Sequence, residues 1–292
     1  MGRGKLHSIK QRIESTKSTQ HITHAMEMVA TAKTGKMVKL WKEFDHFWKS
    51  LDQLMELVYE QGLEEPHPFF SNDHTSSEKT AVVLITSDMG LCGSYNLDLL
   101  RAAEEQADLL DNHFAGYLVI GSKGLSYARY HQLPRLFSEE KLYDTPRFAV
   151  SELVSNQILN VYEREKADSF IALYSQFASS LIQRPASVQL LPWMKKQNTP
   201  STDRKTEYEF EPQPMTLIQT LVPLYLSARV HSLLLESKVS ELFSRQNAMR
   251  NATENARTLI DRFTLEFNKA RQASITQEII EIVNGAEALK EG

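Results

Sequence analysis

The chain has 292 residues, of which 41% are hydrophobic and 24% charged, and its formal net charge is −4. This length allows one or two domains, and the balanced composition is typical of a soluble protein with no general attraction to nucleic acid. A single cysteine, Cys92, excludes an internal disulfide framework, and no apolar run reaches the roughly 18–20 residues needed to span a bilayer.

The first segment predicts a long helix. Residues 3–61 contain no proline, and apolar side chains recur at steps of three and four, so we expect a helix that ends by Gly62. The first 50 residues carry ten Lys or Arg against four acids, a net charge of +6. A solvated helix face is the simpler interpretation of this charge, and a polyanionic partner is the alternative. The apolar positions are Ile9, Ile13, Ile22, Met26, Val29, Leu51, Leu54, Met55 and Val58.

A polar linker at residues 71–79 precedes a region in which short apolar runs alternate with helical patterns. This alternation predicts an α/β domain, Rossmann-like in its layers, with a parallel or mixed sheet. The predicted strands are 80–86, 115–121, 169–174 and 186–191, with a possible edge strand at 207–210; the predicted helices are 97–110 and 150–166, and 122–124 is predicted to be a turn.

The turn at residues 90–93 lies between a strand and a helix, where phosphate-binding loops occur. It matches neither common phosphate-binding pattern, so a tight turn is the simpler interpretation. We expect Asp88 to cap the turn, with metal binding as the alternative, and Cys92 to be a buried small residue. His21 and His24 lie three apart but lack a third metal ligand in view. We therefore predict no catalytic, cofactor-binding or metal-binding residue.

The C-terminal segment predicts one very long helix. Residues 224–284 contain neither Gly nor Pro, which allows a helix roughly 90 Å long. We expect it to open at Met215, with Pro223 kinking it without stopping it. One apolar stripe, rich in alanine, would pack closely on a partner helix. The stripe consists of Ala252, Ala256, Leu259, Phe263, Phe267 and Ala270.

The stripe gives way to small polar side chains after Ala270, and apolar residues then return on every side of the helix. A helix that is apolar all round requires enclosure all round, so the tip is predicted to lie in a collar supplied by a partner. The two long helices most simply pack antiparallel. The predicted domains are a coiled-coil helix at 1–62, an inserted α/β domain at 78–213 and a second coiled-coil helix at 214–290.

Three blocks carry a family resemblance: Ile9-Lys10-Gln11-Arg12-Ile13-Glu14-Ser15-Thr16, Thr86-Ser87-Asp88 with Gly90-Leu91-Cys92-Gly93, and Asn268-Lys269-Ala270-Arg271-Gln272-Ala273-Ser274-Ile275-Thr276-Gln277-Glu278. Nearly end to end, the chain resembles the gamma subunits of F-type rotary ATP synthases. The resemblance implies a non-catalytic central shaft that couples ion flow to ATP synthesis or hydrolysis. Its implied partners are the alpha and beta subunits, the epsilon subunit and the membrane c-ring.

The resemblance also implies roles for single residues. Arg271, Gln272 and Thr276 match positions that meet a beta-subunit loop, Arg245 matches a position coupled to that contact, and Met26 matches the region facing the acidic lever of beta. The apolar tip, Ile279, Ile282, Val283 and Leu289, is expected to act as a bearing.

The implied location is peripheral, on the cytoplasmic face of a bacterial or archaeal plasma membrane or its organelle equivalent. Membrane association would then come only through the complex. The N-terminus shows no apolar signal region, which agrees with a cytosolic or matrix-side chain.

Two other functions stay open at this point. A nucleotide-binding enzyme with a Rossmann-like insert would need a phosphate loop, and a coiled-coil nucleic-acid binder would use the basic N-terminal helix. The chain also departs from the family pattern at His21, His24 and Met89 and over residues 34–48. The second cysteine of the chloroplast redox switch is absent, so we expect no thiol regulation of that type.

Overall fold

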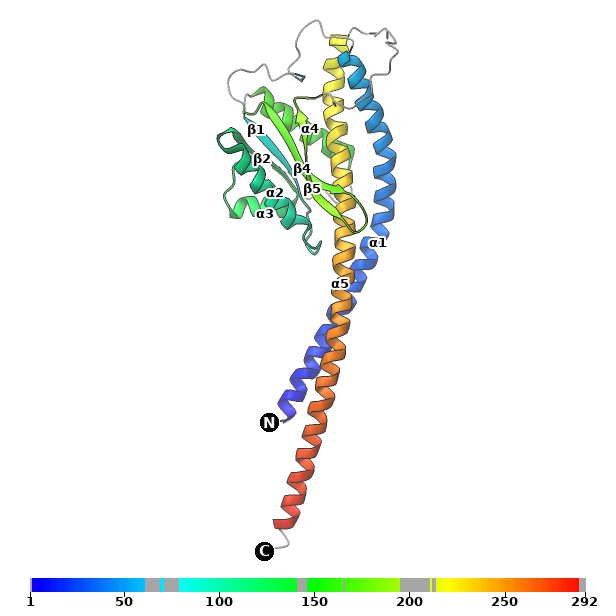
Figure 1. The fold of residues 1–292 in the computed structure, drawn as a ribbon, viewed down its shortest axis with the longest axis vertical. Helices are drawn as coiled ribbons and strands as arrows, with labels where there is room; N and C mark the ends of the chain where they lie inside the picture. The colour runs from blue at the N-terminus through cyan, green and yellow to red at the C-terminus, as the bar shows by residue number, and fades with distance from the viewer. Residues whose placement is uncertain are drawn as a thin grey trace. The chain divides into compact units, whose positions relative to one another are not determined.

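The computed structural model describes residues 2–60, 69–70, 79–140, 146–164, 166–194, 211 and 214–288. Figure 1 shows the elements, which in chain order are α1 (Gly2–Glu60), β1 (Thr80–Ile85), α2 (Tyr95–Leu110), the 3-10 helix η1 (Asp111–His113), β2 (Phe114–Ile120), α3 (Ser122–Tyr130), β3 (Arg135–Glu139), α4 (Phe148–Glu163), β4 (Ser169–Phe177), β5 (Gln183–Leu191) and α5 (Pro214–Ala288). The chain divides into two compact units. The helical unit consists of residues 1–30 and 246–292, and the sheet unit of residues 31–245.

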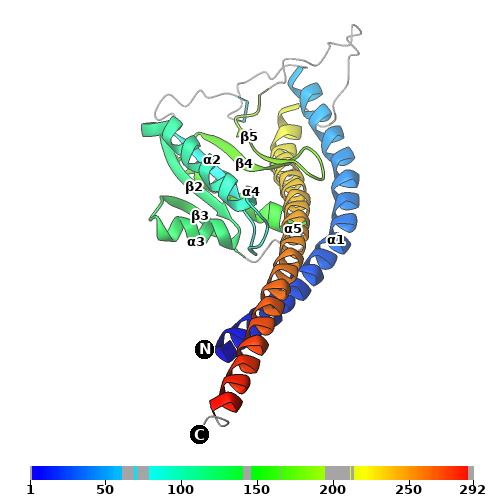
Figure 2. The ribbon, with the colours of Figure 1, turned by 60° about the horizontal axis from the view of Figure 1, so that its bottom comes forward.

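The sheet unit is built on five strands in the order β3-β2-β1-β4-β5. The pairs β3–β2, β2–β1 and β1–β4 are parallel, and β4–β5 is antiparallel. Helices α2 and α3 cover one face, while α4 and the parts of α1 and α5 that belong to this unit cover the other (Figure 2). The predicted α/β insert with a mixed sheet is confirmed.

Strand β1 shows why this layer forms. Ala81, Val83 and Ile85 enter the core beneath α1, α4 and α5, whereas Val82 and Leu84 enter the core beneath α2 and α3. Successive side chains of a strand point to opposite faces, so a strand covered on both faces must be apolar throughout. The continuous apolar run of this segment follows from that requirement.

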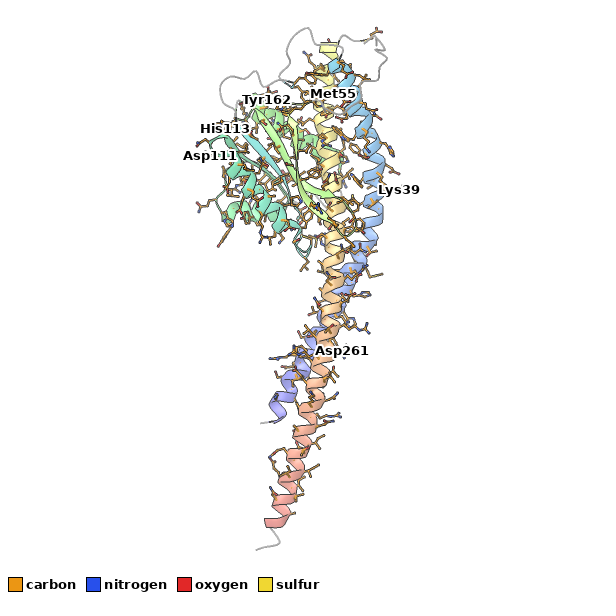
Figure 3. All side chains as sticks on the ribbon, in the orientation of Figure 1. Lys39, Met55, Asp111, His113, Tyr162 and Asp261 are labelled. Carbon is orange, nitrogen blue, oxygen red and sulfur yellow. The ribbon has the colours of Figure 1, made fainter. Side chains whose placement is uncertain are left out.

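Within the sheet unit, α1 and α5 run antiparallel. Met37 packs with Leu235 and Leu242, and further along α1 the Trp48 ring lies 4.9 Å from the ring of Tyr225. Figure 3 labels Met55, which is fully buried on α1, and Lys39, whose exposed side chain projects from the same helix. The α1 face toward α5 is thus apolar and the opposite face charged.

The helical unit is an antiparallel pair. The Thr23 and Thr253 hydroxyls lie 2.8 Å apart, and Arg250 Nε donates to Glu27 Oε1 at 3.1 Å. A later residue of α1 thus contacts an earlier residue of α5, which is the antiparallel arrangement. The less exposed positions alternate by steps of four and three, the period of a left-handed coiled coil. This seam consists of Ile9, Ile13, Thr16, Gln20, Thr23, Glu27 and Ala30 on α1, and Met249, Thr253, Ala256, Ile260, Phe263, Phe267, Ala270 and Ser274 on α5.

Three side chains expected on apolar faces are exposed instead: Ile22, Val29 and Leu259. The seam advances by 3.5 residues on average, so Thr23, Ala30 and Ile260 take those places. Choosing seam positions by apolar residue type therefore gave a position one residue too early. This happened where the seam residue is polar and where two adjacent residues are both apolar.

The structure also corrects some elements of the insert. Residues 122–124, predicted as a turn, form the first turn of α3, and strand β3 was not predicted. β3 is short, half-buried and at the sheet edge, so its Arg-Leu-Phe-Ser-Glu sequence lacks a strong apolar signal. Pro223 does not stop α5, as predicted. The possible strand at 207–210 lies outside the described residues.

Candidate functional site

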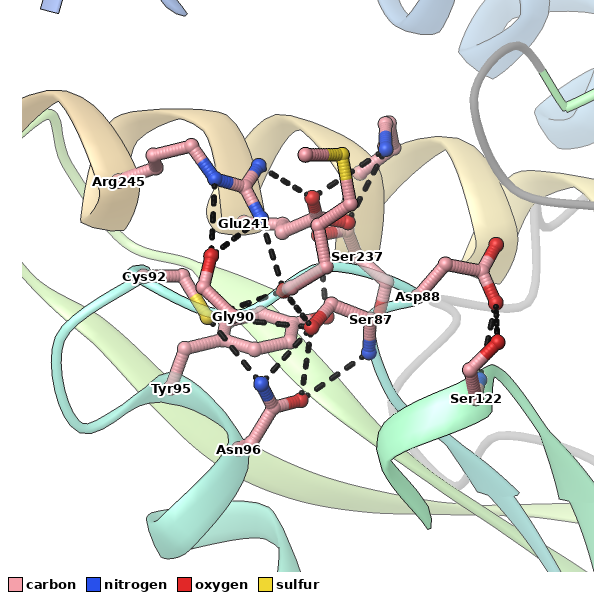
Figure 4. Close-up of polar contacts among 12 residues, drawn as sticks. Ser87, Asp88, Gly90, Cys92, Tyr95, Asn96, Ser122, Ser237, Glu241 and Arg245 are labelled. Atoms are coloured by element: carbon pink, nitrogen blue, oxygen red, sulfur yellow. Dashed lines mark hydrogen bonds and ion pairs between the residues drawn. The ribbon is translucent and has the colours of Figure 1, made fainter. Parts of the chain in front are cut away.

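The order of the strands reverses at β1, and we call the region at the carboxyl ends of β1 and β4, which α5 fills, the crevice. From β1 the chain builds β2 and β3 on one side, and β4 lies on the other side of β1. In open α/β sheets, ligands bind at the carboxyl ends of the strands at such a switch point. Here the turn after β1 meets Arg245 of α5 (Figure 4), and the end of β4 meets residues 236–240 of the same helix.

The turn after β1 is held by its own hydrogen bonds. The Ser87 amide donates to Asn96 Oδ1 at 3.1 Å, and Asn96 Nδ2 lies 2.8 Å from Ser87 Oγ and 3.1 Å from Cys92 Sγ. Cys92 is 2% exposed, which confirms the prediction of a buried small residue. Burial raises the pKa of the Cys92 thiol, against the smaller opposing effect of the Arg245 charge. A protonated, enclosed thiol is a poor nucleophile.

Asp88 caps a helix, although not the one that follows its own turn. Its Oδ1 accepts hydrogen bonds from the amide and the hydroxyl of Ser122, both at 2.9 Å, at the start of α3 (Figure 4). A carboxylate at a helix N-terminus satisfies an otherwise unpaired amide and is favoured by the helix dipole. Asp88 was predicted to cap its own turn, whereas these hydrogen bonds cap α3, a neighbour in space.

Gly121, just before α3, could not be another residue without a rearrangement. Its φ is +101°, and a Cβ atom there would lie 2.3 Å from the carbonyl oxygen of Thr86. This close approach brings the ends of β1 and β2 together, so that Asp88 can reach Ser122.

On the α5 side, the charged centre of the crevice is Glu241, which is 1% exposed. Lys238 donates to it at 3.1 Å, and Arg245 forms an ion pair with it one turn further along. Arg245 Nη2 also donates to the carbonyl oxygens of Met89 at 3.0 Å and Gly90 at 3.3 Å. The turn thus offers carbonyl oxygens to a cation, whereas a phosphate site offers amides to an anion.

A polar stripe on α5 completes the crevice; it consists of Glu236, Ser237, Ser240 and Ser244. Ser240 Oγ donates to the Ser175 carbonyl at 2.9 Å, and Ser244 Oγ donates to the Cys92 carbonyl at 2.7 Å. In return, the Ser175 amide donates to Ser237 Oγ at 3.2 Å and the Phe177 amide to Glu236 Oε1 at 3.1 Å.

Sequence reasoning matched Ser240, Glu241 and Arg245 to the family pattern but did not predict that Glu241 and the polar stripe face the sheet. Polar residues spaced by three and four in a run that is otherwise apolar were a signal that could have revealed it. The run was assigned one partner, the N-terminal helix, whereas residues 225–245 are buried on almost every side.

The structure separates the residues that the family pattern assigns to beta-subunit contacts. Arg245 belongs to the crevice of the sheet unit, with its side chain largely buried. Met26 is half-buried on α1 in the helical unit, and Arg271, Gln272 and Thr276 are exposed on α5 in that unit. Thr276 Oγ1 donates to the Gln272 carbonyl at 2.9 Å, within the helix itself.

The tip of α5 is apolar and exposed. Ile279, Ile282 and Val283 are 56%, 70% and 51% exposed, and Leu289 lies outside the described residues. Contiguous exposed apolar side chains of this kind mark interaction sites.

Among the residues that the structure describes, no group of three or more His, Cys, Asp or Glu side chains is placed to hold a metal ion. The His24 ring lies 3.7 Å from Glu27, which also pairs with Arg250. In the same described part of the chain, no helix combines the length and the hydropathy needed to cross a membrane.

Comparison with known proteins assigns the family. The family model described as ATP synthase matches residues 5–289. The ATP synthase gamma chain of Moorella thermoacetica is 36% identical over 286 residues, which cover 98% of this chain and 99% of the relative. That of Desulfitobacterium hafniense is 33% identical over 282 residues, with 97% and 98% covered.

This chain belongs to the ATP synthase gamma chain family. The predicted resemblance is thereby confirmed. The gamma-chain fold is also similar to that of a chain in the mitochondrial ATP synthase of Euglena gracilis, with a TM-score of 0.69 at 18% identity, covering 98% of this chain and 95% of that one.

Proposed function

We propose that this gamma chain is the central rotor shaft of an F-type ATP synthase. It couples ion flow through the membrane ring to conformational change and ATP synthesis or hydrolysis in the alpha and beta subunits. The exposed apolar tip of α5 carries the proposal. The side chains of residues 275–284 are all exposed to solvent. Five of them are large and apolar: Ile275, Ile279, Ile280, Ile282 and Val283. Such a tip requires a partner that encloses it.

The helical unit supports the proposal through its order of surfaces. The seam reaches Ser274, the residues around it at 271–273 and 275–278 are exposed and mostly polar, and the apolar side chains from Ile279 onward follow. Small polar side chains suit a surface that must slide past several similar partners, because they interlock little. Apolar side chains suit a collar.

A shaft of this kind acts by differential contact. One asymmetric helix pair cannot match three equivalent partners at once, so each beta subunit meets a different face. A partner shifts a conformational equilibrium only through contacts that differ between the states. Rotation therefore exchanges the contacts and with them the nucleotide affinity of each beta subunit.

Within this function, Arg271, Gln272 and Thr276 contact a beta-subunit loop, and Met26 faces the acidic lever of beta. Arg245 acts on that contact through the crevice, where it bonds the turn after β1. The charge of +6 over the first 50 residues complements an acidic partner, and such a contact between exposed charges weakens as salt screens it.

In this proposal, the helices 1–62 and 214–290 form the shaft. The insert 78–213 contacts the epsilon subunit and the c-ring. Attachment to the membrane then comes through the complex, on its cytoplasmic or equivalent face. No binding of nucleic acid is part of this function.

The chain itself is proposed to be non-catalytic. The position at which a Rossmann-like sheet would bind a nucleotide is filled by Ser237, Ser240 and Arg245 of its own helix α5. Calorimetric titration of the purified chain with ATP and ADP is expected to give no binding heat. Saturable binding would favour the alternative, a nucleotide-binding enzyme.

Reconstitution tests the function as a whole. Purified wild-type chain, added to the other subunits of a gamma-depleted complex, is expected to restore ion-coupled ATP turnover, whereas the chain alone hydrolyses no ATP. A chain truncated after Ser274 keeps the seam and serves as the comparison, because it lacks the tip and part of the polar segment. Hydrolysis by the pure chain, or no restoration by the full chain, would contradict the proposal.

A further inference from the structure

We propose that the polar stripe of α5, Glu236, Ser237, Ser240 and Ser244, is the joint that fixes the rotational position of this helix against the sheet. This proposal rests on the proposed function: in a rotor, the joint passes torque between the inserted domain and the shaft. The stripe residues are positioning residues, since they act through the segments that they hold.

The joint bonds main-chain groups at two separate places. Glu236, Ser237 and Ser240 bond the end of β4 through Phe177 and Ser175. Ser244 bonds the turn after β1 through the carbonyl of Cys92. From Glu236 to Ser244 the contacts extend over roughly 12 Å of the helix axis.

Bonds of this kind resist rotation in a way that apolar packing does not. Burial of apolar surface is non-directional, so an apolar helix face gains little from one rotational position over another. A hydrogen bond weakens steeply when its angle or distance departs from the favoured range. Turning α5 by one residue, about 100°, would move the whole stripe away from its main-chain partners.

Residues 235–242 of α5 also form a second face, which is apolar. Leu235, Val239 and Leu242 pack with Met37 and with Trp41 of α1. Apolar residues would also fill the crevice side, so burial alone does not account for four polar residues there. Their hydrogen bonds specify one register of α5 on the sheet, which is what a torque-bearing joint requires.

The test compares a breaking pair with a conserving pair in the full complex. Glu236→Met with Ser244→Ala removes an acceptor and a donor at similar volume. Glu236→Gln with Ser244→Thr retains the side-chain oxygen in both places. Glu43→Met with Ser50→Ala is the matched control, because Glu43 is exposed and the exposed Ser50 hydroxyl donates to the His46 carbonyl of its own helix.

Each complex is reconstituted into vesicles, and ATP-driven ion transport is measured against ATP hydrolysis. The breaking pair is expected to lower ion transport per ATP several-fold, while the conserving and control pairs keep the wild-type ratio. A wild-type ratio in the breaking pair would overturn the proposal. Equal loss in the conserving pair would also overturn it, since that loss would not depend on the hydrogen bonds.

Hydrogen exchange in the isolated full chain checks the joint without the motor. The Phe177 amide, which donates to Glu236, is expected to exchange faster in the breaking pair and at the wild-type rate in the conserving pair. Faster exchange with unchanged coupling would reject the torque role and leave the rotor function standing. A wild-type chain that restores no turnover would instead reject the rotor function.

Discussion

His231 shows how the buried part of α5 remains uncharged. Its Nδ1 lies 2.9 Å from the Ser151 hydroxyl, and its ring lies edge-on to Phe44 with centroids 4.6 Å apart. Burial among these groups lowers its pKa from 6.5 to about 4. The imidazole is therefore neutral near pH 7, and it packs as an aromatic side chain with one hydrogen bond.

This pKa predicts a loss of stability in acid. Between about pH 6.5 and pH 4 the unfolded chain binds a proton at His231 that the folded chain does not, so stability falls as the pH falls through this window. The loss is up to about 3 kcal/mol, at 1.36 kcal/mol per unit of pKa difference. Above pH 6.5 the contribution is fully present.

Urea unfolding followed by tryptophan fluorescence measures this effect, because all three tryptophans, Trp41, Trp48 and Trp193, belong to the sheet unit. His231→Gln is expected to flatten the acid slope relative to wild type, while the exposed His46→Gln keeps it. The same slope in wild type and in His231→Gln would contradict the assignment.

Arg245 provides a second prediction for single residues. Arg245→Met leaves Glu241 with Lys238 as its partner and removes the donor from the carbonyls of Met89 and Gly90. Breaking a buried ion pair typically costs about 3–5 kcal/mol, and we expect the lower end because Lys238 remains. Lys49→Met, which breaks an exposed pair with Asp45, should cost less than about 1 kcal/mol. Equal costs in the same urea assay would argue against the buried network.

The elements differ in how strongly their sequences specify them. β1 is covered on both faces and reads as one apolar run, whereas β3 is a half-buried edge strand with no such run. The long helices follow from their length without Pro or Gly, but their seam does not follow from apolar identity. Thr23 and Glu27 lie on it, and both meet polar partners on α5.

Close packing of the helix pair predicts the effect of enlarging a seam residue. Ala256 is buried at the seam, so Ala256→Leu should separate the helices at a cost of about 1–3 kcal/mol. Hydrogen exchange is expected to speed up across residues 249–267. Thr258→Leu adds a similar side chain at an exposed position and should change little. Unchanged protection in Ala256→Leu would show that the seam lies elsewhere.

Across the molecule, one helix has three environments. Residues 225–245 of α5 are buried almost all round in the sheet unit; in the helical unit, residues 249–274 are buried on one side, and residues 275–284 are exposed. The helix α5 is one continuous element whose residues belong to both units. The exposed tip is the part of α5 where enclosure of the helix by a partner can be tested.

Replacing tip residues should weaken the assembled complex and spare the isolated chain. Burying one such side chain is worth about 1.5–3 kcal/mol, so Ile279→Gln with Ile282→Gln should weaken gamma-chain retention by more than about tenfold. Retention is measured as gamma chain left on the complex after dilution. Leu265→Gln, at an exposed position beside the seam, is the control. Equal retention of the tip variant would contradict enclosure.

The sequence by itself determined the long helices, the alternating α/β insert, the apolar tip and the family, because length, periodicity and local motifs are properties of contiguous residues. Only the tertiary structure decided the crevice. Asp88 caps α3 across the sheet, and Ser244 and Arg245 bond a turn some 150 positions earlier in the chain. Such partners are chosen by strand order and helix packing, which bring together groups that are distant in the sequence.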